Sequence, residues 1–98
     1  MFTIEEIKQK AVPIAKKYGV KKLSLFGSYA RGDADEESDV DFIFDDSDGK
    51  IKSYFHYLDF VFDLEDEFKC KIDLVSEGIF DKKFLNEIKN DEVILYER

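Results

Sequence analysis

The chain contains one cysteine, one histidine, one proline and no tryptophan among its 98 residues. A single cysteine cannot form an internal disulfide, and one Cys with one His cannot build a Cys/His metal site. No apolar run reaches the roughly 18 residues that a membrane-spanning helix needs. The first residues also lack the basic stretch followed by an apolar stretch that marks a signal peptide. We therefore predict a cytoplasmic protein without membrane contact.

Negative charge is concentrated in one part of the chain. Nine acidic residues and no Lys or Arg lie between Asp33 and Asp48, whereas the net charge of the whole chain is −8. The rest of the chain is therefore close to neutral. An acidic block of this size repels phosphate backbones, which argues against direct nucleic-acid binding. Length and a hydrophobic content of 44% predict a single domain over residues 1–98 with one modest core.

Hydrophobic spacing and capping signals divide the chain into alternating helices and strands. Thr3 and Glu6 form a capping box at the start of a first helix that ends near Gly19, with Pro13 as a candidate for a kink or break. Further helices are predicted at residues 51–68 and 82–89, and strands at 20–26, 40–44, 70–75 and 93–96. This order predicts an α/β (α+β) fold with helices packed against one small sheet.

The segment from Ile51 to Phe68 is the longest predicted helix. Most of its apolar residues fall within about half of the helix circumference, so this face is predicted to pack on the sheet. Phe60 lies outside that face, among polar residues, and is predicted to be exposed. An exposed aromatic side chain there is a candidate contact for a partner protein, although single exposed aromatics are common.

Asp39 and Asp41 lie in a segment that is otherwise typical of a β-strand. Alternate strand residues share a face, so the two carboxylates would lie about 7 Å apart on one side of a sheet. They would repel each other, and no Lys or Arg is close in sequence to compensate. The other acids of this region, from Asp33 to Glu37, are typical of a solvated loop.

Asp73 is a third acid within an apolar, strand-like run. Taken alone, it would be an outward residue of an edge strand, paired with Lys69 or Lys71. Taken with Asp39 and Asp41, it suggests one cation site that accounts for all three acids. Ligation by carboxylate oxygens suits Mg²⁺ or Mn²⁺, with water and substrate phosphates at the remaining positions.

Gly27 and Ser28 follow an apolar strand and open a short helical segment. Free N–H groups at such a turn favour phosphate oxygens, glycine permits close approach, and a serine hydroxyl can donate a further hydrogen bond. The alternative is an ordinary turn with serine as a cap. Beside a carboxylate pair that needs a metal, a phosphate-binding turn suggests a nucleoside triphosphate as ligand.

Three segments in this order resemble the signature of the DNA polymerase beta nucleotidyltransferase superfamily: Gly27-Ser-Tyr-Ala-Arg-Gly32, Ser38-Asp-Val-Asp41 and Ile72-Asp73-Leu. The whole domain is similar in layout to its minimal nucleotidyltransferase (MNT) branch. The resemblance implies a mixed sheet flanked by helices, two Mg²⁺ ions and ATP as substrate. The residues that it implies as metal ligands and catalytic groups are Asp39, Asp41 and Asp73, and those implied for nucleotide binding are Gly27, Ser28, Arg31 and Ser38.

The resemblance also implies a reaction and a partner. A hydroxyl group attacks the α-phosphorus and pyrophosphate leaves, with Asp73 as the candidate base. MNT proteins are typically antitoxins that adenylylate a tyrosine of a HEPN toxin, and the acidic surface here is compatible with a basic partner. Two alternatives remain: a non-catalytic module that blocks its partner by contact, and a homodimeric nucleotidyltransferase for small molecules.

Overall fold

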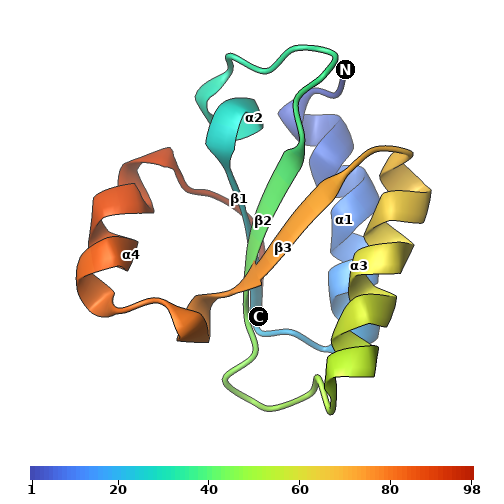
Figure 1. Ribbon diagram of the computed structural model, residues 1–98, viewed down its shortest axis with the longest axis vertical. Coiled ribbons are helices and arrows are strands. Elements are labelled where there is room, and N and C mark those ends of the chain that lie inside the picture. The colour runs from blue at the N-terminus through green and yellow to red at the C-terminus, as the bar shows by residue number, and fades with distance from the viewer.

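The computed structural model describes all 98 residues and contains four strands and four helices (Figure 1). The strands are β1 Lys22–Phe26, β2 Val40–Asp45, β3 Ile72–Ser76 and β4 Val93–Glu97. The helices are α1 Ile4–Tyr18, α2 Gly27–Arg31, α3 Tyr54–Phe68 and α4 Lys82–Ile88, with 3₁₀ turns η1 Glu77–Ile79 and η2 Lys89–Asp91. The strand order is β3-β2-β1-β4; β2 and β3 are parallel and the other pairs antiparallel. The predicted α/β class with a mixed sheet is confirmed.

The first helix begins and ends where its capping signals predict. The Glu6 amide donates to the Thr3 hydroxyl over 3.1 Å, and the Thr3 amide donates to the Glu6 carboxylate over 3.0 Å. Gly19 ends the helix with a positive φ of 73°, which glycine adopts readily. Pro13 does not break the helix, and its ring lies on the exposed side. None of the helices is long and apolar enough to cross a membrane.

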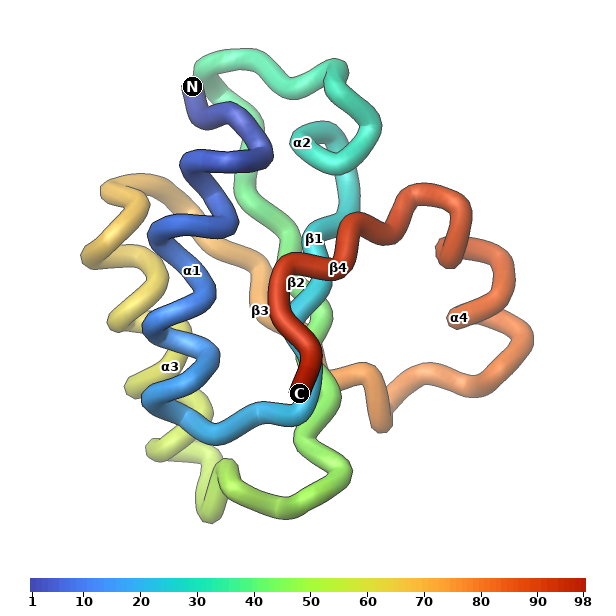
Figure 2. The backbone as a smooth tube through the Cα atoms, turned by 180° about the vertical axis from the view of Figure 1, so that it is seen from behind, coloured from blue at the N-terminus to red at the C-terminus, as the bar shows by residue number.

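The two faces of the sheet differ in cover. α1 and α3 lie side by side on one face, and α4 lies on the other (Figures 1 and 2). The buried strand residues of the core are Leu23, Leu25, Val40, Phe42, Phe44, Ile72, Leu74 and Leu95. Because strand side chains alternate, Phe26, Asp41 and Ile43 face the α4 side. The sheet therefore presents carboxylates on its less covered face.

The predicted helix from Ile51 begins three residues later, because the Ser53 hydroxyl caps it by accepting the His56 amide at 3.1 Å. The prediction that Phe60 is exposed is wrong. Its ring is fully buried and stacks on Tyr18 with centroids 4.7 Å apart. Aromatic residues occur all around α3, so the apolar pattern does not define one buried face. The exposed aromatics are instead Tyr54 (68%), Phe55 (77%) and Phe62 (57%).

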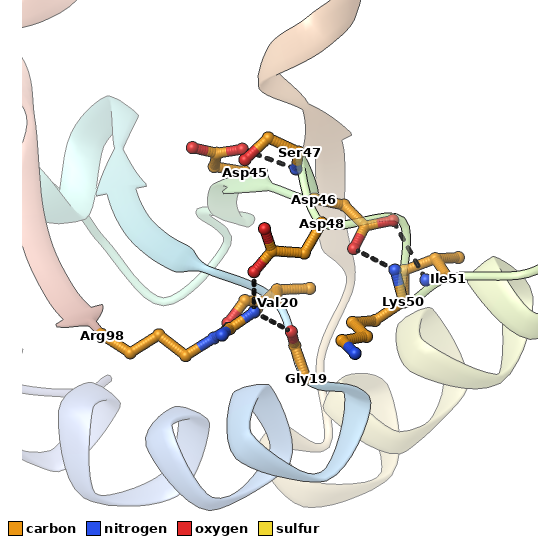
Figure 3. Close-up of polar contacts among 9 residues, drawn as sticks. All are labelled: Gly19, Val20, Asp45, Asp46, Ser47, Asp48, Lys50, Ile51 and Arg98. Carbon is orange, nitrogen blue, oxygen red and sulfur yellow. Dashed lines mark hydrogen bonds and ion pairs between the residues drawn. The ribbon is translucent and has the colours of Figure 1, made fainter.

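The loop that follows β2 is held by its own aspartates, as Figure 3 shows. The Asp46 carboxylate accepts the amides of Lys50 and Ile51 at 2.9 and 3.0 Å. Arg98 donates to the carbonyls of Gly19 and Val20 and pairs with Asp48, which ties the last residue to this loop. The acids of residues 45–49 therefore serve local structure.

Candidate active site

Gly27 joins β1 to α2 at the end of the sheet opposite the loop of Figure 3. Its φ is 72°, and a Cβ atom added there would lie 2.1 Å from Oδ2 of Asp41. Any other residue would therefore displace that carboxylate. The sequence predicts that a phosphate approaches Gly27 closely. In the structure, the carboxylate of Asp41, a predicted catalytic residue, packs against Gly27. Ser28, the next residue, is half-buried at the start of α2.

Asp41 on β2 and Asp73 on β3 form the centre of the site. They are register partners in the parallel pair, so their side chains share one face. Burial raises the pKa of Asp41 to about 6. A hydrogen bond to Asp73 and the negative charges of Asp73 and Asp39 raise this pKa further, whereas the positive charge of Arg31 lowers it. The predicted approach of these two acids from separate strands is therefore seen. Neither carboxylate forms an ion pair, so the protein compensates their charge only in part, through Arg31.

Asp39 lies at the rim, directly before β2, and is not drawn into the pair. Its carboxylate is 3.8 Å from Nζ of Lys71; the Lys71 side chain is exposed and the Asp39 side chain is half-buried. This contact is not predictable from the sequence, because Lys71 lies in the segment before β3, where its carbonyl accepts the Val40 amide. No three His, Cys, Asp or Glu side chains lie close enough together to hold a metal ion as they stand.

Arg31 and Ser38 contact the acidic connector between α2 and β2. The Arg31 guanidinium lies 3.3 Å from the Asp33 carboxylate and 4.0 Å from that of Asp91. The Ser38 hydroxyl accepts the Asp35 amide at 2.9 Å. Both residues thus shape the loop beside the carboxylates, and the predicted exposure of its acids is confirmed. Their predicted contact with a nucleotide stays a prediction.

The donor set suits a hard divalent cation. Asp41 and Asp73 offer only oxygen ligands, which Mg²⁺ and Mn²⁺ prefer over thiolate or imidazole sites. The repulsion that raises the pKa of a carboxylate beside another carboxylate is relieved when a cation binds between them, so such a pair favours cation binding. Asp39 can join after a rotation away from Lys71, because that ion pair is solvent-exposed and worth little. The residues present therefore fit a magnesium site.

Comparisons with known proteins identify the family of this chain. The profile of the family "Polymerase beta, Nucleotidyltransferase" matches residues 9–98. "Putative protein adenylyltransferase MJ1379" of Methanocaldococcus jannaschii is 35% identical over 92 residues, covering 93% of this chain and 92% of the relative. Protein adenylyltransferase MntA of Thermococcus cleftensis is 34% identical over 82 residues, covering 80% and 81%.

Solved structures share the fold. A toxin–antitoxin complex with AMP-PNP has a TM-score of 0.77 at 17% identity, covering 93% of this chain and 73% of that chain. A tri-AMPylated Shewanella oneidensis HEPN toxin in complex with MNT antitoxin has a TM-score of 0.69 at 15% identity, covering 93% and 70%. The family profile and the sequence relatives span nearly the whole chain and include both strands that carry the carboxylates. The chain therefore belongs to the polymerase beta nucleotidyltransferase family.

Proposed function

We propose that this chain is a Mg²⁺-dependent protein adenylyltransferase that transfers AMP from ATP to a tyrosine of a HEPN-type toxin and so acts as its antitoxin. The observation that carries the proposal is the only partly compensated Asp41–Asp73 pair, packed against Gly27. Carboxylates held together without a full counter-charge are costly, and a metal-bound triphosphate removes that cost. The pair lies at the end of the sheet where the β1–α2 turn offers backbone amides.

Each residue has a role in the proposed transfer. Asp41 and Asp73, joined by Asp39, hold the metal, and the backbone at Gly27 and Ser28 binds the outer phosphates. Mg²⁺ held there would supply charge neutralisation at the phosphates. Asp73 is exposed and accepts the proton of the acceptor hydroxyl as that oxygen bonds to the α-phosphorus. The bond from the α-phosphorus to the departing pyrophosphate then breaks.

The choice of acceptor is supported by the relatives and by the surface. Sequence relatives carry the name protein adenylyltransferase, and one structural neighbour is an MNT antitoxin with a tri-AMPylated HEPN toxin. The exposed aromatics Tyr54, Phe55 and Phe62 on α3 offer an apolar contact surface. Phe60, the aromatic first considered for this purpose, is buried and cannot contribute.

A transfer assay tests the proposal. The protein is incubated with labelled ATP, Mg²⁺ and the protein encoded next to it, and the intact mass of that neighbour is measured. We expect mass added in steps of one AMP, on a tyrosine, and none with the double variant Asp39→Asn plus Asp41→Asn. Asp45→Asn is the matched control, because it changes the same residue type at the other end of β2.

Each outcome has a distinct meaning. Transfer that survives the double variant would refute the metal mechanism. Tight binding of the neighbour without any added mass would instead favour an antitoxin that blocks by contact.

A further inference from the structure

A cavity of about 260 Å³ lies between α4 and the sheet face that carries Asp41. Phe26 and Ile43 from the sheet form its apolar floor, and α4 contributes Leu85, Asn86 and Lys82 to its wall. Ligand pockets for complete drug-sized molecules start near about 300 Å³. The cavity is therefore large enough for a nucleoside-sized fragment and too small for an entire nucleoside triphosphate.

The floor of this cavity adjoins the carboxylate pair. Phe26 lies directly opposite Asp41 in the β1–β2 register. Ile43 is two residues beyond Asp41 on the same face, a distance of about 7 Å along the strand. A ligand whose phosphates rest at the carboxylates can therefore place its other end over Phe26 and Ile43 without leaving the sheet.

The charges around the cavity favour an anionic ligand. Inside, Lys22 lies 3.0 Å from Glu92 and 3.8 Å from Glu77, the two carboxylates of the lining, and the Ser24 hydroxyl donates to Glu92 over 2.6 Å. Lys82 and Lys89 also line the cavity but form no ion pair. Lys82 lies at the start of α4, and Lys89 lies just past its end, on the side of α2 and the carboxylates. They suit a ligand that carries phosphate.

We infer that this cavity takes the nucleoside of the bound triphosphate, with the ring system over Phe26 and Ile43, Asn86 as hydrogen-bonding partner of the base, and Lys89 toward the phosphates. The inference rests on the proposed use of a nucleoside triphosphate. Planar rings favour contact with an aromatic floor. An asparagine amide can donate and accept together, as reading of a base edge requires. α4 would then select the nucleotide, while the carboxylates perform the transfer.

Binding measurements separate the nucleoside contribution from that of the phosphates. Calorimetry with Mg²⁺ compares ATP with inorganic tripolyphosphate, which has the phosphates but no nucleoside. In Asn86→Trp a large side chain is placed at the cavity wall, and Glu87→Trp places the same side chain on α4 away from it. We expect Asn86→Trp to lower the affinity for ATP by about tenfold or more, equivalent to the loss of one or two good contacts. Tripolyphosphate should bind unchanged, and Glu87→Trp should bind both ligands as the parent does.

A second pair of variants tests the lysines without adding bulk. Lys89→Ala should weaken ATP binding several-fold, and Lys83→Ala, in the adjoining helix α4 but outside the cavity, should not. A thermal melt of each variant verifies that it is folded. The inference is overturned if ATP binds no more tightly than tripolyphosphate, if Asn86→Trp leaves ATP affinity intact, or if that variant loses transfer while still binding ATP. The last result would assign the cavity to the acceptor.

These outcomes are distinct from failure of the proposed function. A protein that binds ATP through α4 but transfers nothing refutes the adenylyltransferase proposal and leaves the nucleoside cavity in place. A protein that transfers AMP but whose affinity for ATP does not depend on Asn86 or Lys89 refutes the nucleoside cavity and leaves the adenylyltransferase proposal in place.

Discussion

The two ends of β2 both carry aspartates from one acidic run, and the fold treats them in opposite ways. At the end drawn in Figure 3, Asp45 accepts the Ser47 amide at 2.8 Å, Asp46 accepts two further amides, and Asp48 pairs with Arg98. At the other end, Asp41 faces Asp73, and its pKa is raised to about 6. The same residue type is structural in one place and only partly compensated in the other.

This difference shows which acids indicate a function. A carboxylate that accepts backbone amides replaces its lost water and stabilises a turn. A carboxylate held against another carboxylate lowers stability unless a ligand arrives. The number of acids in a run therefore does not indicate function. The partner of each acid distinguishes the acids that stabilise the loop from those of the candidate site.

The largest effect is expected from Asp73→Asn. Transfer should fall by at least about 100-fold, since even residues that only orient a metal ligand cost about 10–100-fold when they are changed. The unfolding midpoint should stay level or rise, because the substitution removes a like charge beside Asp41. Enzyme assays and urea titrations measure the two quantities. A destabilised Asp73→Asn protein would contradict the comparison, because it would place Asp73 among the structural acids.

Gly27→Ala and Gly49→Ala compare the same change at the two ends. Both glycines have positive φ, 72° and 67°, so each alanine carries a backbone cost of about 1–2 kcal/mol. Space around Gly49 is open, whereas the new Cβ at Gly27 would lie 2.1 Å from the Asp41 carboxylate. We expect similar losses of stability but a loss of transfer only in Gly27→Ala. Equal activity of the two variants would show that Asp41 can move without consequence.

Much of the fold follows from local signals in the sequence. The capping box at Thr3, the end of α1 at Gly19 and all four strands are confirmed within a few residues. The burial of α3 was not predictable by the same means, because aromatic residues surround the helix. Only the packing of Phe60 on Tyr18 and Phe44 determines which side faces the core. Sheet order likewise depends on contacts between distant segments.

The candidate site was predictable to the extent that its residues interrupt a pattern. Asp41 and Asp73 are acids within strands, and Gly27 ends a strand, so each stands out in the sequence. Lys71 does not, because its contact with Asp39 exists only when β2 and β3 are adjacent. The cavity under α4 was also missed, since its wall and floor come from segments far apart in the chain.

Asp46→Ala tests the structural end. It removes the acceptor of the Lys50 and Ile51 amides, which should lower the free energy of unfolding by about 1–2 kcal/mol, as loss of a helix cap does. Urea denaturation measures this change. Ser47→Ala is the neighbouring control, because its side chain makes no hydrogen bond that the loop requires. Transfer per folded molecule should equal that of the parent, and a loss of activity would mean that this end also contributes to the reaction.

The smallest effect is a dependence of stability on pH. The pKa of Asp41 is about 6 in the folded, metal-free protein, against about 3.9 in an unfolded chain. Between these values the folded state holds more protons, so this group lowers the free energy of unfolding as pH rises from about 4 to about 6. Glu92 and Asp63 have lowered pKa values and give the opposite slope, so the whole curve does not isolate Asp41.

The difference in unfolding free energy between the parent and Asp41→Asn isolates the contribution of Asp41. In EDTA, the stability of the variant relative to the parent should increase from pH 4 to pH 6 and then level off. Mg²⁺ at pH 7 should reduce that difference, because the cation compensates the carboxylates only in the parent. Chemical denaturation at each pH measures both effects. A difference that is flat with pH would mean that Asp41 is already compensated by the protein, as the aspartates of the opposite end are.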